Sequence, residues 1–182
     1  MAAIVGYLLG SVPVALLVAR RHGVDLHATG DGNPGAWNAL EQLGGRRAWP
    51  AFIGDALKGL AAGGAGWALG GDVETAYAGV AGAMVGHALP LFSGLRGGKA
   101  VMTFVGGMFA VALISTAAAL AVCGAVSLAA RSFAVGARVG IVCVPVFQAL
   151  VDGPERVIAT GILMCLIGLL FVVRRRDAPA PD

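Results

Sequence analysis

The sequence predicts an all-α, polytopic integral membrane protein with seven transmembrane helices, the N-terminus outside and the C-terminus in the cytoplasm. Hydrophobic residues make up 58% of the 182-residue chain and charged residues only 13%, a balance far from that of a soluble domain. Long apolar runs recur along the chain, and most are near the ~20 residues that a span needs. Basic residues gather in alternate connections between these runs, as the positive-inside rule requires.

The apolar runs define the expected elements in order. The first covers residues 2–19, and because no basic segment precedes it and further runs follow, we expect a first transmembrane helix and not a cleaved signal peptide. Residues 48–69 and 76–92 are expected to form the second and third helices. Residues 132–151 and 157–173 are expected to form the last two.

The run from residue 100 to residue 130 is longer than one span, with 31 residues and no charge. As a single helix it would be about 46 Å long, against a hydrocarbon core of about 30 Å. It is therefore either one strongly tilted helix or two short ones, with the turn expected at Ser115 and Thr116.

The charge distribution favours two short helices and hence seven spans. In that topology eleven of the 13 basic residues face the cytoplasm, whereas six spans would place the last basic groups outside. The cytoplasmic basic residues are then Arg20, Arg21, Arg46, Arg47, Arg96, Lys99, Arg131, Arg138, Arg174, Arg175 and Arg176. We expect one domain over residues 1–176 and a disordered tail over residues 177–182.

Small residues are expected to bring these helices close together. The 29 glycines fall at small-xxx-small spacings, as in Gly6 and Gly10 or Gly82 and Gly86, which is typical of helices packed tightly in lipid. The three cysteines are isolated from one another in apolar runs, so they are interpreted as core residues: Cys123, Cys143 and Cys165.

A polar, glycine-rich segment at residues 30–38 interrupts this hydrocarbon-like chain. Asn33 and Pro34 are expected to open a short helix, because Asn is a favoured N-cap and Pro a favoured first helical residue. Such a loop can direct backbone N–H groups at one point, where a helix N-terminus adds positive potential. The segment is therefore a candidate cradle for an anionic head group beside a lipid tail.

Two ionisable residues lie within the second expected span. Lys58 comes 11 residues after Arg47, or about 16 Å deep by helix rise. Asp55 and Lys58 are three residues apart, so they share a helix face and can neutralise each other. They are either a structural ion pair that fixes helix packing or part of a functional site, which is the default interpretation of ionisable groups at membrane depth.

A third polar element follows the third expected span. Gly97, Gly98 and Lys99 precede a helix, which is a geometry suited to phosphate: a backbone nest, a helix dipole and a cation. The spacing is not that of a Walker loop, and no metal motif or nucleophile–base set is present. His87 near the end of the third span is interpreted first as a packing residue. No basic stripe with interleaved aromatics points to nucleic acid.

In this order, the elements resemble the bacterial acyl-phosphate:glycerol-3-phosphate acyltransferase family (PlsY type). That family carries Gly-Ser near the first helix, a GSGNxGxTN loop, a DxLKG helix, the segment GHxxPxFxxFxGGKGVAT and a C-terminal HRxNI segment. The resemblance covers roughly residues 6–110. The matching segments here are Gly10–Pro13, Gly30–Asn38, Asp55–Gly59, Gly86–Pro90 with Phe92, and Gly97–Thr103.

The resemblance implies transfer of an acyl group from acyl phosphate to the 1-hydroxyl of glycerol 3-phosphate, which yields lysophosphatidate for phospholipid synthesis. The implied partners are the acyl phosphate donor, a small polar acceptor and membrane lipids, with no cofactor, metal or catalytic side chain. The implied location is a bacterial-type plasma membrane, with the site on the cytoplasmic side. The implied substrate-binding residues are Gly32, Asn33, Gly35, Asn38, Lys58, Gly97, Gly98 and Lys99, with support from His87.

Three positions depart from the family pattern and are expected to alter specificity. Asp31 replaces the loop serine, Trp37 replaces the threonine, and Glu41 stands where an arginine is common. The C-terminal His/Asn segment is replaced by residues 174–178. Two carboxylates are thus expected near the acceptor, where a like charge at 4 Å repels by about 4 kcal/mol at an effective dielectric near 20.

Three functions stay open at this point. The chain is an acyltransferase on glycerol 3-phosphate, an enzyme with the same donor and a non-phosphate acceptor such as a polyol or amine, or a non-catalytic membrane protein or transporter. The transporter ranks third, because the last four expected spans carry few polar residues.

Overall fold

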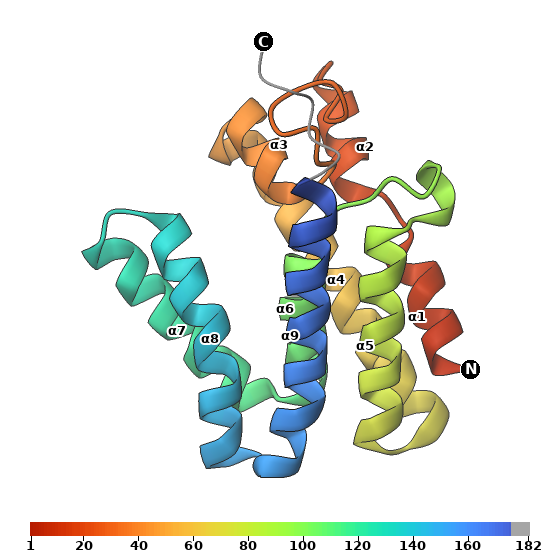
Figure 1. The fold of residues 1–182 in the computed structure, drawn as a ribbon, viewed down its shortest axis with the longest axis vertical. Coiled ribbons are helices and arrows are strands. Elements are labelled where there is room, and N and C mark those ends of the chain that lie inside the picture. The colour runs from red at the N-terminus through yellow and green to blue at the C-terminus, as the bar shows by residue number, and fades with distance from the viewer. Residues whose placement is uncertain (176–182) are drawn as a thin grey trace.

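The computed structural model describes residues 1–175 and shows only helices and connecting segments in that range (Figure 1). The predicted tail at residues 177–182 lies outside the described residues. The elements are α1 (Ala2–Gly10), α2 (Val14–Arg21), α3 (Ala36–Leu43), α4 (Gly45–Gly70), α5 (Val73–Ala88), the 3₁₀ turn η1 (Leu91–Ser93), α6 (Val101–Val111), α7 (Leu113–Ala129), α8 (Phe133–Val151) and α9 (Pro154–Arg175).

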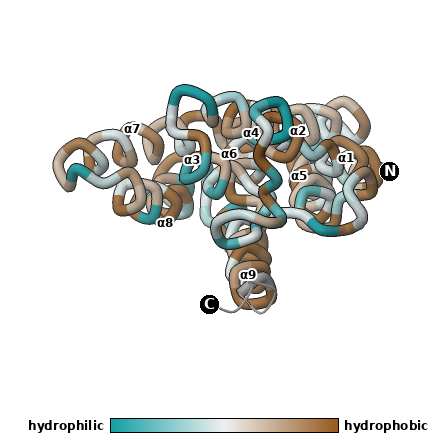
Figure 2. Tube along the Cα trace, turned by 90° about the horizontal axis from the view of Figure 1, so that it is seen from above, coloured by the Kyte–Doolittle hydropathy of each residue, from teal (hydrophilic) through white to brown (hydrophobic). Residues whose placement is uncertain are grey.

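The helices stand side by side in a broad row, with α1 and α5 at one edge and the α7–α8 hairpin at the other (Figures 1 and 2). Seen from the end at which α2 and α3 lie, α9 stands out from one face of this row (Figure 2). Four segments among the described residues are long and apolar enough to cross a membrane by length and composition: Ala2–Arg21, Val73–Ser93, Phe133–Val151 and Pro154–Val173.

The first apolar run is broken, contrary to the single helix expected over residues 2–19. α1 ends at Gly10 and α2 begins at Val14, with Pro13 at the N-cap of α2. Proline lacks an N–H and its ring clashes with the preceding turn, so it favours a break at this point. The break leaves the Val12 carbonyl outside the helical ladder, where it accepts a hydrogen bond of 3.0 Å from Lys58 Nζ.

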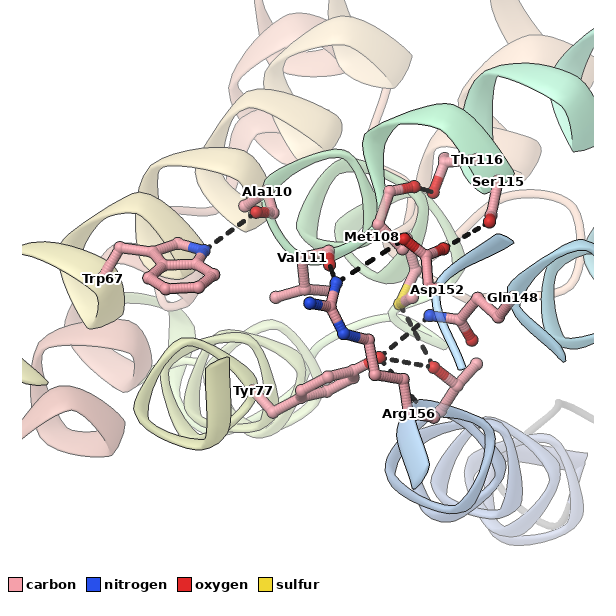
Figure 3. Close-up of polar contacts among 12 residues, drawn as sticks. Trp67, Tyr77, Met108, Ala110, Val111, Ser115, Thr116, Gln148, Asp152 and Arg156 are labelled. Atoms are coloured by element: carbon pink, nitrogen blue, oxygen red, sulfur yellow. Dashed lines mark hydrogen bonds and ion pairs between the residues drawn. The ribbon is translucent and has the colours of Figure 1, made fainter. Parts of the chain in front are cut away.

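The long run at residues 100–130 divides into α6 and α7, as expected, but the turn is at Ala112 and not at Ser115–Thr116. Two distant side chains donate to the last carbonyls of α6: Trp67 Nε1 to Ala110 O at 2.9 Å, and Arg156 Nη1 to Val111 O at 2.8 Å (Figure 3). They provide the partners that the end of a helix lacks and that lipid cannot supply.

The same end of the bundle holds a buried polar cluster that joins α5, α8 and α9 (Figure 3). The Tyr77 hydroxyl accepts from Gln148 Nε2 at 3.0 Å and lies 2.9 Å from Thr160 Oγ1. Ser115 Oγ donates to the Asp152 carboxylate, which also faces Arg156 Nη1 at 3.6 Å. These contacts link the α7–α8 hairpin to the remaining helices at its connection to α9.

The contact of α1 with α5 runs through glycines, as the small-xxx-small spacing predicts. A Cβ on Gly6 would overlap the Gly79 carbonyl, and one on Gly10 would overlap the Ala83 carbonyl. On the facing helix, Gly82 and Gly86 lie equally close to the backbone of α1. Backbones therefore touch directly, which gives dense van der Waals packing where the hydrophobic effect contributes little.

Candidate phosphate-binding site

The three polar elements singled out in the sequence meet at the end of the molecule where α2 and α3 lie. The loop between α2 and α3 contains residues 30–35, and the loop between α5 and α6 contains Gly97 and Gly98 (Figure 1). A Cβ on Gly98 would lie 3.4 Å from Gly35 Cα and would overlap His87 Nε2. The glycines thus allow two loops and the end of α5 to approach one another closely.

Asn38 organises the loop of residues 30–38 from within. It is fully buried, and its Nδ2 donates to the carbonyls of Leu26, Thr29 and Asn33 at 3.1, 2.9 and 3.1 Å. These bonds occupy the amide hydrogens of Asn38, so in this structure Asn38 shapes the loop and does not face a ligand with its N–H groups.

The helix after this loop begins later than expected. α3 starts at Ala36 with Gly35 as its N-cap, and no side chain caps it, so the prediction that Asn33 caps and Pro34 opens the helix was wrong by two residues. Gly35 N donates to Asn33 O at 2.8 Å, a tight local turn that precedes the helix.

Asp55, Lys58 and His87 form a buried charged cluster between α4 and α5. Lys58 Nζ lies 2.9 Å from Asp55 Oδ1, and His87 Nδ1 lies 3.6 Å from the same oxygen. The predicted pairing of Asp55 with Lys58 is confirmed. The cluster fits both interpretations offered by the sequence. As a structural element, Lys58 binds the Val12 carbonyl at the break of the first apolar run, and as part of a candidate site it lines a small pocket with His87 and Gly98.

The backbone N–H groups of Gly97 and Gly98 are used within the protein. Gly97 N donates to Ala88 O at 3.1 Å, and Gly98 N donates to His87 O at 3.2 Å. The nest expected from the sequence is therefore not formed by these two N–H groups in this structure. A Cβ on Gly97 would overlap the His87 carbonyl, so glycine is needed there for close packing of the loop on α5.

Lys99 lies at the meeting point of the two loops and directly before α6. Its Nζ donates to Asp31 Oδ2 at 3.1 Å and lies 4.9 Å from the centre of the Phe171 ring on α9. The Lys99 side chain is 20% exposed and that of Asp31 is 43% exposed, so the pair is at the rim of the site. One of the residues that depart from the family loop thus contacts the predicted phosphate-binding cation.

An open recess of about 360 Å³ lies beside this ion pair. It is lined by His27, Asp31, Gly32, Asn33, Pro34, Arg96 and Gly97. The narrower pocket that contains Lys58 shares Pro34, Arg96 and Gly97 with it, so the two spaces have a common wall. The Arg96 guanidinium in the wall of the recess and the neighbouring Lys99 ammonium can both bind an anion.

Two residues of this recess, Arg96 and His27, were not predicted from the sequence. Arg96 directly precedes Gly97 and was counted only toward topology. Its position one residue before the glycine pair is the signal that identifies it. His27 carries no such signal, since nothing in the local sequence shows that it lines the same recess as Arg96.

Of the three residues expected to alter specificity, only Asp31 lines the recess among the described residues. The Trp37 ring stacks on Phe133 of α8 at 5.8 Å between centroids, and its Nε1 donates to Glu41 Oε1 at 2.7 Å. Glu41 is thus engaged by Trp37 and is not a wall of the recess. The basic segment expected to replace the C-terminal His/Asn motif begins at residue 174, and its continuation from residue 176 lies outside the described residues.

Known proteins match the chain over nearly its full length. A curated glycerol-3-phosphate acyltransferase of Geobacter sulfurreducens is 35% identical over 174 residues, which cover 95% of this chain and 88% of that protein. One from Clostridioides difficile is 39% identical over 155 residues, or 82% of this chain and 76% of that protein. The crystal structure of PlsY, an integral membrane glycerol 3-phosphate acyltransferase, in its glycerol 3-phosphate form has a TM-score of 0.80 at 29% identity and covers 97% of this chain and 87% of that one.

The helical bundle, together with these matches, defines an integral membrane acyltransferase. The sequence model described as glycerol-3-phosphate acyltransferase matches residues 1–179. The chain belongs to the glycerol-3-phosphate acyltransferase family of the PlsY type, so the resemblance seen in the sequence is confirmed.

Proposed function

We propose that this protein transfers an acyl group from acyl phosphate to the 1-hydroxyl of glycerol 3-phosphate and releases lysophosphatidate and phosphate. The observation that carries this proposal is the recess beside Lys99, which brings Arg96, Gly32, Asn33 and Gly97 together at one end of the bundle. Family membership supports it, as does the likeness to PlsY structures in the glycerol 3-phosphate form and the lysophosphatidic acid form.

The proposed chemistry requires positioning more than activation, because an acyl phosphate is already activated. Lys99 and Arg96 neutralise the phosphates, and the loop of Gly32 and Asn33 forms the wall against which the acceptor lies. The donor phosphate accepts the proton of the attacking hydroxyl. Holding both reactants and stabilising developing negative charge account for the rate enhancement.

In this proposal Lys58 and His87 line the narrower pocket beside the recess and hold its walls in place. Lys58 keeps one face of its ammonium toward the pocket while Asp55 neutralises it at 2.9 Å. His87 fixes the glycine loop, since Gly98 lies against its ring. Gly35 and Gly98 allow the two loops to approach closely, and the Asn38 side chain holds the loop that lines the recess.

We further propose that the chain is one domain with seven spans in a bacterial-type plasma membrane, with the N-terminus outside and the site on the cytoplasmic side. The distribution of basic residues supports this orientation. In this topology α1 and α2 together, α4, α5, α6, α7, α8 and α9 are the spans. The acyl chain stays in the lipid while the phosphates meet at the cytoplasmic surface.

A second acceptor class is favoured by one observation, the carboxylate of Asp31 in the wall of the recess. A neutral polyol or an amine meets no repulsion from Asp31, whereas an acceptor phosphate does. Glu41 gives less support to this alternative than expected, because its carboxylate is bound to Trp37.

The decisive experiment supplies the purified, reconstituted protein with acyl phosphate and a panel of acceptors, and identifies the lipid products by mass spectrometry. Lysophosphatidate is expected from glycerol 3-phosphate. The Lys99→Ala variant is expected to lose at least about a hundredfold in kcat/KM while staying folded, because a cation that stabilises transition-state charge contributes that much. A different acyl ester or amide would support the second acceptor class, and unchanged turnover by Lys99→Ala would refute the role of Lys99.

A further inference from the structure

The predicted phosphate-binding cation already has an anion beside it. Lys99 Nζ and Asp31 Oδ2 are 3.1 Å apart although the residues are 68 positions apart in the chain. A carboxylate oxygen at that distance from an ammonium has the position that a phosphate oxygen would take in a charge-assisted hydrogen bond. The contact therefore places a protein anion where the family chemistry requires a substrate anion.

The Asp31 carboxylate is held in this position by the loop. Its Oδ1 accepts from Asn33 N at 3.0 Å, an Asx turn, so that Oδ2 faces Lys99. Gly30 and Gly32 on either side have φ values of +62° and +68°, a left-handed backbone that only glycine adopts at little cost. The local conformation thus presents one oxygen to the loop and one to the cation.

We propose that Asp31 is a specificity-determining residue that occupies Lys99 until a substrate phosphate displaces it. This inference rests on the proposed function of the recess. A singly charged anion gains nothing by exchanging with a carboxylate of the same charge. A phosphate group with a charge near −2 forms the stronger pair with Lys99 and takes its place. Asp31 therefore selects for phosphate and weakens its binding at the same time.

The chain supplies a matched pair of variants for the test. Asp31→Asn keeps an oxygen that accepts from Asn33 N, removes the charge that faces Lys99 and replaces the acceptor there by an N–H donor. Asp25→Asn makes the same change in the same loop, where Asp25 Oδ1 accepts from His27 N at 3.0 Å in an equivalent turn. Both variants remove a negative charge from the loop, but only Asp31→Asn changes the contact with Lys99.

The first measurement is the binding of inorganic phosphate. It is monitored as the thermal shift of the purified protein in detergent at increasing phosphate concentration. The half-saturating phosphate concentration of Asp31→Asn is expected to be about fivefold lower than that of the wild type, which corresponds to the upper value for an exposed ion pair. Asp25→Asn is expected to match the wild type. Equal half-saturation in Asp31→Asn and wild type would overturn the proposal, and this result does not depend on any transferase activity.

The second measurement separates KM from kcat for glycerol 3-phosphate. Asp31→Asn is expected to lower KM about fivefold and to leave kcat within about twofold, because the carboxylate competes for binding and takes no part in the chemistry. A fall in kcat at constant KM would assign Asp31 to the chemical step and overturn the proposal. Absence of lysophosphatidate from the wild type would count against the proposed function, and the phosphate titration would still decide the role of Asp31.

Discussion

Ala100 connects the glycine loop to α6 in a conformation that suits glycine better than alanine. Its φ is +57°, in the left-handed region, and it is the N-cap of α6 directly after Lys99. The Cβ makes this conformation cost about 1 kcal/mol or more. A backbone strained at this point fixes the direction in which the Lys99 side chain leaves the loop.

Ala100→Gly is therefore expected to leave the protein about 1 kcal/mol more stable than Ala112→Gly does, because both changes lose a buried methyl group and add unfolded-chain entropy but only Ala100→Gly removes strain at positive φ. Thermal unfolding in detergent measures the effect as a higher melting temperature. Ala112→Gly is the matched control: this alanine is equally buried and also sits at a helix junction, but its φ is −152°. Equal melting temperatures for the two variants would contradict the assignment of strain to Ala100.

Local spacing predicted some side-chain contacts, and distance along the chain concealed others. Asp55 and Lys58 could be paired because residues three apart share a helix face. The Lys99–Asp31 contact joins two loops 68 residues apart, and a single sequence does not show which distant loops meet in the fold. The Trp37–Glu41 contact, in contrast, joins positions i and i+4 of α3 and could have been predicted from spacing; the family pattern placed Glu41 near the acceptor instead.

At the scale of elements, the junction of α6 and α7 depends on side chains from elsewhere. Trp67 at the end of α4 and Arg156 at the start of α9 donate to the carbonyls of Ala110 and Val111 (Figure 3). The sequence predicted that the run must break, from its length alone. The position of the break depends on these donors, which is why Ser115 and Thr116 were the wrong choice. Both instead lie buried in the first turns of α7.

Arg156→Gln is expected to lower the free energy of unfolding by about 1 kcal/mol or more, because the Val111 carbonyl loses its donor at 2.8 Å and Asp152 loses its counter-charge. Thermal unfolding in detergent measures this loss. Arg138→Gln on the exposed face of α8 removes the same charge without touching this junction and is expected to be neutral. Equal melting temperatures for all three proteins would show that Arg156 does not stabilise the junction.

At the scale of the whole molecule, the helical bundle and the meeting of its three polar elements followed from the sequence. Apolar runs of span length indicate transmembrane helices without any knowledge of distant contacts, so the fold class could be predicted from local sequence alone. The shape of the bundle did not follow. The α7–α8 hairpin stands apart at one edge of the row and α9 on its face (Figures 1 and 2), an arrangement set by the stack of Trp37 on Phe133 and the cluster around Tyr77.

The seven-span topology can be tested with an impermeant maleimide on intact cells, after Cys123, Cys143 and Cys165 are replaced by alanine. Single cysteines at the exposed positions Glu74 and Glu155 are both expected to react from outside, and one at His22 only after permeabilisation. Glu155 decides the issue, because six spans would place it on the cytoplasmic side. Labelling of Glu74→Cys together with protection of Glu155→Cys would reject seven spans.

The contact between Lys58 and the Val12 carbonyl has a consequence for how the chain enters the membrane. The helical hydrogen bonds of the first apolar run are interrupted at Pro13, and α4 contains an ammonium and a carboxylate. Each segment alone is therefore costly to insert into lipid. Together they satisfy each other: the Val12 carbonyl, which accepts a local bond from Val14 N, gains a second donor, and the lysine gains an acceptor. In the proposed topology the first two spans therefore become stable in the bilayer as a pair, and a nascent chain that stops before α4 would lack the partner that completes its first span.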